Sequence, residues 1–107
     1  MALSPYYGRI FRMASSFEWD SVKAEANLKK HAVSFAESQL AFLDTKRVIA
    51  RDKRHSSSEQ RLYCLGMVEG RVLTVRFTYR NEKFRIIGAG YWRKGKKLYE
   101  AKNQIHR

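Results

Sequence analysis

The chain begins with two stretches in which apolar residues recur at helical intervals. Between Ser21 and Lys30 the apolar positions are Val22, Ala24, Ala26 and Leu28. Asp20 precedes this stretch and predicts an N-cap, because its carboxylate can accept hydrogen bonds from the first free N–H groups of a helix. We therefore expect a first helix over residues 21–30, with its apolar positions facing the core.

A second helix is predicted from Ser34 onwards. Ser34 and Glu37 have the spacing of a capping box, in which each side chain satisfies the backbone N–H group of the other residue. Asp44 and Thr45 are expected to end this helix. Its apolar face is expected to comprise Phe35, Ala36, Leu40, Phe42 and Leu43.

After Lys46 the spacing changes to that of β-strands. Four strands are expected, at residues 47–51, 61–68, 71–79 and 83–89. The third strand alternates between two faces, with Leu73, Val75, Phe77 and Tyr79 on one of them. Turns at Glu69-Gly70 and Asn81-Glu82 connect the last three strands, so we expect an antiparallel meander.

A third helix is predicted from Tyr91, although Gly95 disfavours its first turn. Its buried positions are expected to be Leu98, Ala101 and Ile105. The predicted fold is α+β, with two N-terminal helices, a four-stranded antiparallel sheet and a C-terminal helix, all helices lying on one sheet face. Residues 17–107 form a single domain, and residues 1–16 are an N-terminal extension, for which Met13 is an alternative start.

The balance of charge predicts a phosphate-rich partner. The 107 residues include 22 Lys and Arg against 10 Asp and Glu, a formal charge of +12. A cationic surface gains free energy when it neutralises phosphates and releases their counterions. Five basic residues lie between Lys46 and Arg54 and nine between Arg71 and Lys97, with one acidic residue in each stretch. The alternatives are a solvated surface, for the run 93–97 above all, or an acidic protein partner.

Other compositional signals are weak. The single cysteine, Cys64, lies in an apolar strand, cannot form an internal disulfide and fits a reducing, cytoplasmic location. Three histidines and one cysteine lack the spacing of a zinc site, and we expect no metal and no other cofactor. No apolar run is long enough to span a membrane, and no signal peptide is evident.

Several short motifs together resemble one protein family. They are Phe17-Glu18-Trp19-Asp20, Lys23, Ala26-Asn27-Leu28-Lys29-Lys30-His31, Val33-Ser34-Phe35, His55-Ser56, Glu59, Arg61, Gly66, Thr78, Arg80 and Arg85-Ile86-Ile87. This pattern, from Phe17 to about Glu100, resembles the BrnT toxins of bacterial type II toxin–antitoxin pairs. The resemblance implies a RelE-like fold, an endoribonuclease that cleaves cellular RNA and arrests translation, and neutralisation by a cognate antitoxin. It also implies a hetero-oligomer in which the antitoxin binds operator DNA.

Two departures from the family pattern bear on activity. Ala32 stands where the family usually has glycine, and Gly88-Ala89-Gly90 stands where it commonly has Ser-Ala-Arg. Gly90 therefore replaces the arginine of the family pattern, and Arg93 or Lys94 is the candidate to supply the missing positive charge. The alternative function is therefore a catalytically weak or inactive toxin homologue that acts as an antitoxin-binding co-repressor module. A third interpretation is a nucleic-acid-binding protein that works alone.

Metal-independent RNA cleavage needs a base at the 2′-oxygen, an acid at the leaving 5′-oxygen, and cations beside the phosphate. Arg80 and Arg85, which flank the last hairpin, are the main candidates for the cations, because arginine binds two phosphate oxygens and stays charged. His55 is the candidate acid or base. Glu59 either orients His55, acts as the base, or forms a structural salt bridge with Arg61 or Arg85.

Further residues are expected to bind RNA through charge or stacking. His31, at a predicted helix end, is expected to stabilise the helix rather than to act in catalysis. The predicted RNA-binding residues are Lys53, Arg54, Arg61, Arg76, Tyr79, Arg93 and Lys94. If Arg76 and Arg85 point away from the helices, they form one cationic surface. The nearby rings of Tyr79, Tyr91 and Trp92 are then candidates to stack on unpaired bases.

Overall fold

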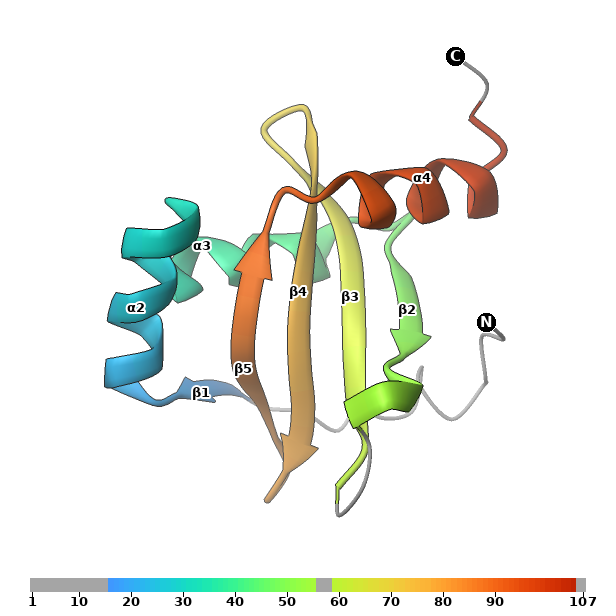
Figure 1. Ribbon diagram of the computed structural model, residues 1–107. Helices are drawn as coiled ribbons and strands as arrows, with labels where there is room; N and C mark the ends of the chain where they lie inside the picture. The colour runs from blue at the N-terminus through green and yellow to red at the C-terminus, as the bar shows by residue number, and fades with distance from the viewer. Residues whose placement is uncertain (1–15, 56–58, 106–107) are drawn as a thin grey trace.

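A five-stranded mixed sheet organises the protein (Figure 1). The computed structural model describes residues 16–55 and 59–105. The strands are β1 (Ser16–Trp19), β2 (Val48–Arg51), β3 (Arg61–Val68), β4 (Arg71–Arg80) and β5 (Lys83–Gly90). Their order across the sheet is β1-β5-β4-β3-β2, with β1 parallel to β5 and the other neighbours antiparallel.

Helical segments cover both faces of this sheet. They are α2 (Ser21–His31), α3 (Phe35–Ser38), the 3₁₀ turns η1 (Gln39–Leu43) and η2 (Lys53–His55), and α4 (Arg93–Lys102). In Figure 1, α3 and η1 lie behind the strands, whereas α4 crosses in front of β4 and β3. We call these the α3 face, which includes Val75 and Phe77, and the α4 face, which includes Thr74 and Arg76.

The prediction of two N-terminal helices followed by four antiparallel strands is wrong. The first described element is the strand β1, whose parallel pairing places Phe17 beside Phe84 and Trp19 beside Ile86. A four-residue strand is too short to show a clear alternation, and its partner lies far along the chain. The expectation that all helices pack on one face is also wrong. Residues 1–15, with the alternative start at Met13, lie outside the described residues, and Ser16 already belongs to β1.

Local signals in the sequence do determine the caps and turns. The Asp20 carboxylate accepts a hydrogen bond from Lys23 N at 3.1 Å, and Ser34 Oγ accepts one from Glu37 N at 2.9 Å. Only this half of the predicted capping box forms, because the Glu37 carboxylate accepts instead from Tyr91 Oη at 3.0 Å. Both predicted hairpin turns form, with positive φ at the two residues of each turn. Such two-residue turns match the natural twist of paired strands.

The predicted buried face of α2 is wrong at Val22, Ala26 and Leu28, and only Ala24 packs against the core. Val22 is 72% exposed and Leu28 is 50% exposed. The helix instead buries Asn27, whose Nδ2 donates to the carbonyls of Val33 and Ala89 at 3.0 Å each and whose Oδ1 accepts from Ala89 N at 3.1 Å. This polar side chain therefore ties α2 to β5 and to the segment after the helix.

Two other predicted apolar faces hold only in part. Phe35 and Phe42 are buried, but Leu40 and Leu43 are 46% and 73% exposed. The chain changes from α-helix to 3₁₀ at Gln39, so α-helical spacing no longer places these residues correctly. On α4, Tyr99 is buried and Ala101 is exposed, the reverse of what the spacing predicted.

The two faces have cores of different size. Phe17, Phe42, Phe77 and Phe84 form a network of ring contacts within the large core of the α3 face. The smaller core beneath α4 contains Val48, Leu65, Val72 and Tyr99. Gly95 permits the close approach of α4, because an added Cβ would lie 1.9 Å from Thr74 Oγ1. Much of the α4 face thus remains available for polar side chains.

Candidate nucleic-acid interface

The strand register brings four of the predicted arginines, Arg61, Arg76, Arg80 and Arg85, onto the α4 face. Tyr63 on β3 pairs with Arg76 on β4, and Arg76 pairs with Gly88 on β5. Thr78 pairs with Arg85. A β-bulge shifts the register between Arg76 and Phe77, so that Arg85 lies on the same face of the sheet as Arg76. These four arginines consequently project from the sheet on the side opposite α3.

A pocket of about 600 Å³ opens between η2, the strands and the start of α4. It contains five cationic side chains, one carboxylate and two aromatic rings, so its charge favours an anionic ligand. We call it the basic pocket. Its lining residues are Arg51, Asp52, Lys53, Arg54, Tyr63, Leu65, Thr74, Arg76, Trp92, Lys94, Gly95 and Leu98.

Arg76 forms an ion pair with Asp52, the one carboxylate among the lining residues of the basic pocket that the structure describes. Its Nη2 is 3.9 Å from Oδ2 of Asp52, a carboxylate that is only 4% exposed. Within the described residues, the buried Nε of Arg76 has no hydrogen-bond partner. Because the ion pair is long and 29% of the side chain is exposed, the guanidinium can still bind an oxyanion.

Tyr63 adds a protonated hydroxyl group to the same pocket. Burial raises the pKa of this phenol, and the neighbouring Asp52 carboxylate raises it further. Tyr63 therefore stays neutral at physiological pH. A neutral phenol can donate a hydrogen bond or a proton to an oxygen of a bound ligand.

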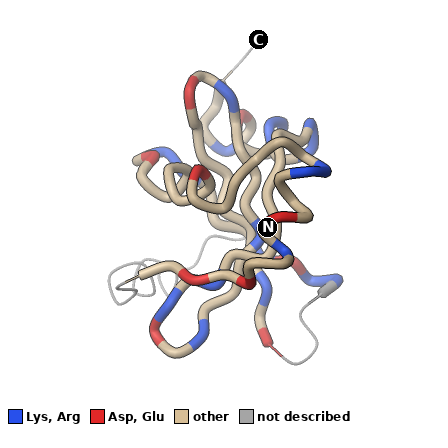
Figure 2. The backbone as a smooth tube through the Cα atoms, turned by 90° about the vertical axis from the view of Figure 1, so that its left-hand side faces the viewer, with Lys and Arg blue, Asp and Glu red and all other residues tan. Residues whose placement is uncertain are grey.

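At the end of the sheet near the β4–β5 turn, at the bottom of Figure 1, the arginines in contrast form ion pairs with carboxylates. Arg80 Nη2 and Nε contact the two carboxylate oxygens of Glu59 at 2.7 and 3.2 Å, and Arg85 Nη1 contacts Glu18 Oε2 at 3.2 Å. The hydrogen bond from Arg80 lowers the pKa of Glu59. Figure 2 shows basic and acidic positions close together at this end of the molecule. These ion pairs partly neutralise the two arginines that were predicted, from the sequence, to stabilise the phosphate.

The structure gathers some of the predicted residues and separates others. Lys53, Arg54, Arg76 and Lys94 line the basic pocket. Arg61 lies at the start of β3, opposite Thr78. Arg93 lines a second pocket on the other side of α4. His55 ends η2 directly after Arg54, but its side chain lies outside the described part of the chain.

Tyr79 lies apart from all of these residues. It packs against the core of the α3 face, with its ring 5.8 Å from that of Phe84. The alternation of β4 had already placed it with Phe77, so the strand period was the signal that separates it from Arg76.

The sequence patterns did not single out Arg51, Asp52 or Tyr63, although they line the basic pocket, whereas Trp92, which also lines it, was expected among the rings near the cationic surface. Strand alternation could have found Tyr63, because it is two residues after Arg61 on β3 and shares its face. Asp52 follows β2 directly, and only its burial beside Arg76 distinguishes it from an ordinary loop carboxylate.

The two departures from the family pattern have structural explanations. Ala32 is the C-cap of α2 and has φ +58°, a left-handed conformation that favours glycine. At Gly90, an added Cβ would lie 2.4 Å from Cε2 of Trp92, whose ring occupies the space of a side chain. His31 is the last residue of α2, and its ring lies 5.2 Å from the Trp92 ring.

Cys64 lies in the core, as its place in an apolar strand predicted. Burial raises the pKa of its thiol strongly. Within residues 16–55 and 59–105, no helix is long and apolar enough to cross a bilayer. In the same residues, no three side chains of His, Cys, Asp or Glu gather as metal ligands would.

One comparison with known proteins identifies the family of this chain. No curated protein matches the sequence. The family model described as the ribonuclease toxin BrnT of type II toxin–antitoxin systems matches residues 19–95, well over half of the chain. That range includes every residue of the basic pocket except Leu98. The chain therefore belongs to the BrnT family of ribonuclease toxins.

Proposed function

We propose that this protein is a toxin that cleaves cellular RNA as a metal-independent endoribonuclease and so inhibits translation. The observation that carries the proposal is the basic pocket, in which five cationic side chains face one carboxylate on an uncovered part of the α4 face. Neutralisation of phosphates by such side chains favours binding of a polynucleotide. Tyr63 and Trp92 add rings on which unpaired bases can stack, which favours a single strand.

The proposed reaction is attack of a ribose 2′-hydroxyl on the adjacent phosphorus. The 2′-proton passes to a base, the P–O5′ bond breaks, and an acid protonates the leaving 5′-oxygen, which leaves a 2′,3′-cyclic phosphate. Charge that develops on the non-bridging oxygens needs cations in fixed positions. Arg76 is suited to this role because it lines the pocket, its side chain is 29% exposed, and its ion pair with Asp52 is long, at 3.9 Å.

We assign the proton transfers to residues next to Arg76. Tyr63 is the proposed acid, because it lines the basic pocket and lies opposite Arg76 in the strand register, with a hydroxyl group that hydrogen-bonds to Asp52 and stays protonated. His55, which directly follows the pocket-lining Arg54, is the proposed base. Glu59 is a poor base in this structure, since Arg80 holds its pKa below the ordinary value.

Arg80 and Arg85 are proposed to extend the cationic track beyond the pocket. The Arg80 side chain is 45% exposed and the Arg85 side chain 31% exposed, so a phosphate can reach and compete for either guanidinium. Glu59 does form a salt bridge, the structural alternative expected from the sequence, but its partner is Arg80 and not the expected Arg61 or Arg85. Replacement of Arg80 or Arg85 by alanine should reduce toxicity while the fold remains intact.

The proposed partner is a cognate antitoxin that binds and neutralises the toxin in a hetero-oligomer. Operator DNA is proposed to be bound through that antitoxin. The location that fits an RNA target is the cytoplasm. These proposals follow from membership of a type II toxin family.

One observation favours a second function. The pairing of Arg80 with Glu59 and of Arg85 with Glu18 leaves less free positive charge than catalysis by those arginines requires. A weak or inactive toxin that holds its antitoxin as a co-repressor module is consistent with that pairing.

Incubation of the purified protein with RNA in EDTA tests the two functions against each other. We expect cleavage that persists in the chelator and yields 2′,3′-cyclic phosphate ends. The Tyr63→Phe variant, purified in the same way, controls for contaminating nucleases and should cleave far more slowly. Intact RNA combined with tight antitoxin binding would support the co-repressor instead.

A further inference from the structure

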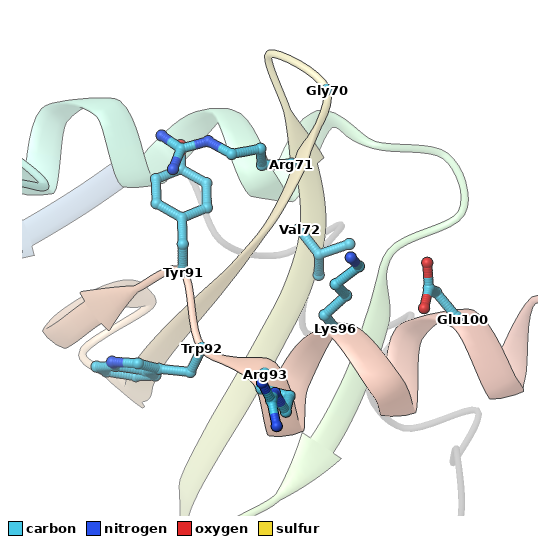
Figure 3. A pocket seen from close by; sticks show the side chains of 8 residues that line it. All are labelled: Gly70, Arg71, Val72, Tyr91, Trp92, Arg93, Lys96 and Glu100. Atoms are coloured by element: carbon cyan, nitrogen blue, oxygen red, sulfur yellow. The ribbon is translucent and has the colours of Figure 1, made fainter. Parts of the chain in front are cut away.

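Trp92 occupies a position between two cationic pockets. It is the one residue in the described chain that lines both the basic pocket and a second pocket of about 360 Å³ on the other side of α4. Figure 3 shows the second pocket, with the Trp92 indole beside the start of α4. Its lining residues are Gly70, Arg71, Val72, Tyr91, Trp92, Arg93, Lys96 and Glu100.

The protein fixes the Trp92 ring from two directions. The indole occupies the space that a side chain at residue 90 would take, because a Cβ added to Gly90 would lie 2.4 Å from Cε2 and 2.7 Å from Nε1. The ring of His31 meets it nearly at right angles, with centroids 5.2 Å apart. A large ring held in this way loses little conformational entropy when a ligand stacks on it.

Positive charge lies on both sides of this ring. The second pocket contributes Arg71, Arg93 and Lys96, and the Arg71 guanidinium lies 3.8 Å above the centre of the Tyr91 ring (Figure 3). The basic pocket contributes Arg76 and Lys94 among its five cations. An aromatic ring with cations on either side is the arrangement by which proteins bind single-stranded nucleic acids.

We infer that Trp92, seated on Gly90, is a stacking platform for an unpaired base of a single strand that crosses the start of α4. The phosphates on the two sides of that base then approach the cations of the two pockets. This inference deepens the proposed function, on which it rests, because it adds a base-binding position to the same RNA site. It also gives Gly90 a role, since a larger residue there would displace the platform.

Tryptophan fluorescence can test this position directly, because the chain has two tryptophans. Trp19 lies on the α3 face, with its ring 6.2 Å from that of Phe35. In the Trp19→Phe variant, Trp92 is the sole tryptophan; in Trp92→Phe, Trp19 is the sole one. Each is titrated with a short 2′-O-methyl oligonucleotide, which lacks the nucleophile and cannot be cleaved.

We expect the oligonucleotide to quench the fluorescence of Trp92 strongly and that of Trp19 little. An abasic oligonucleotide of equal length should bind through its phosphates but should cause little quenching. Trp92→Ala should weaken binding of the base-containing oligonucleotide roughly 10- to 100-fold, the usual loss for one stacked base. Trp92→Phe should retain most of the affinity, because it keeps an aromatic face.

The matched pair Gly90→Ala and Gly88→Ala tests how the ring is held. A Cβ at Gly88 would meet only Asn27 Oδ1, at an ordinary contact distance of 3.7 Å. Gly90→Ala should shift the Trp92 emission spectrum and reduce quenching, whereas Gly88→Ala should change neither.

The outcomes separate the inference from the proposed function. Tight binding without quenching of Trp92, or equal quenching by the abasic oligonucleotide, would overturn the stacking platform and leave the nuclease proposal intact. Base-dependent quenching together with an RNA substrate that stays intact would support the platform and contradict the nuclease. Absence of any binding at low salt would overturn both.

Discussion

The two faces of the sheet differ in what their side chains do. On the α3 face, Phe17, Phe42, Phe77 and Phe84 form a dry aromatic core. On the α4 face, a small core lies beneath the helix and the rest carries charge, with Arg76 at its centre. One face therefore stabilises the fold, and the other has the side chains that a polynucleotide can use.

This difference also explains the family motifs. Phe17, Trp19, Asn27 and Phe35 belong to the motif phrases near the N-terminus, yet all four serve packing or hydrogen bonding on the α3 side or at the sheet edge. A motif can thus identify a family through its structural residues. The proposed chemistry instead belongs to the α4 face, where the described residues of the basic pocket include five cationic side chains and one carboxylate.

The largest expected effect separates the faces by activity. Arg76→Ala removes the proposed stabiliser of the phosphate charge, so kcat/KM for RNA cleavage should fall roughly 100- to 1,000-fold. Lys29→Ala removes a cation from α2, where the side chain is 76% exposed, and should change the rate less than about twofold. Circular dichroism should show both variants folded. Similar losses of activity in the two variants would mean that overall charge, not the basic pocket, governs cleavage.

The second prediction concerns stability on the α3 side. Asn27→Ala removes three buried hydrogen bonds and leaves backbone groups unsatisfied, so the free energy of unfolding should fall by about 3 kcal/mol. Urea denaturation measures the change. Leu28→Ala is the matched control, because Leu28 is half-exposed and its loss should cost less than about 1 kcal/mol. A small effect of Asn27→Ala would contradict its role as the link between α2 and β5.

The third prediction concerns the hydrogen bond from Tyr99 of α4 to Asp44, whose contribution to stability depends on pH. The Asp44 carboxylate accepts hydrogen bonds from Tyr99 Oη at 2.5 Å and from Met67 N at 2.8 Å. Burial raises the pKa of Asp44, but these hydrogen bonds outweigh it and the net pKa is below the ordinary value. Because the folded pKa is the lower one, the carboxylate stabilises the fold fully above about pH 4 and this contribution disappears as pH falls through the folded value.

Asp44→Asn should accordingly lower the free energy of unfolding by about 2 kcal/mol at pH 7 and by much less at pH 3. Urea titrations of both proteins at the two pH values give the comparison. A difference that stays constant with pH would show that the ionised carboxylate has no special role.

The smallest expected effect is a gain in stability. Ala32→Gly relieves the left-handed conformation at the end of α2 and should raise the free energy of unfolding by about 0.5–1 kcal/mol. Ala26→Gly, in the exposed interior of the same helix, should lower it by about 1 kcal/mol. Thermal unfolding of the two variants should shift in opposite directions; a shift in the same direction would contradict the assigned conformation of Ala32.

Short-range signals account for what the sequence could predict of the fold. Asp20, Ser34 and the two hairpin turns act through neighbours only a few residues away, and each forms as expected. The strand β1 depends on a partner more than 60 residues further along, so no local pattern announces it. Asn27 is similar, because its burial depends on Ala89 of β5.

The candidate site was predictable in its charge and not in its pairings. Lys53, Arg54, Arg76 and Lys94 stand in the two basic stretches of the sequence, and the fold brings them to one pocket. The bidentate contact of Arg80 with Glu59 joins residues 21 positions apart, and such geometry is absent from composition. Tyr63 is a candidate only because the register between β3 and β4 places it beside Arg76.

The central claim is that RNA binds to the α4 face. Amide hydrogen exchange of the protein with and without an uncleavable 2′-O-methyl RNA tests it most directly. We predict increased protection over residues 51–55, 61–65 and 92–98, with little change over α2 at residues 21–31. Protection confined to α2 and α3, with none at the start of α4, would contradict the claim.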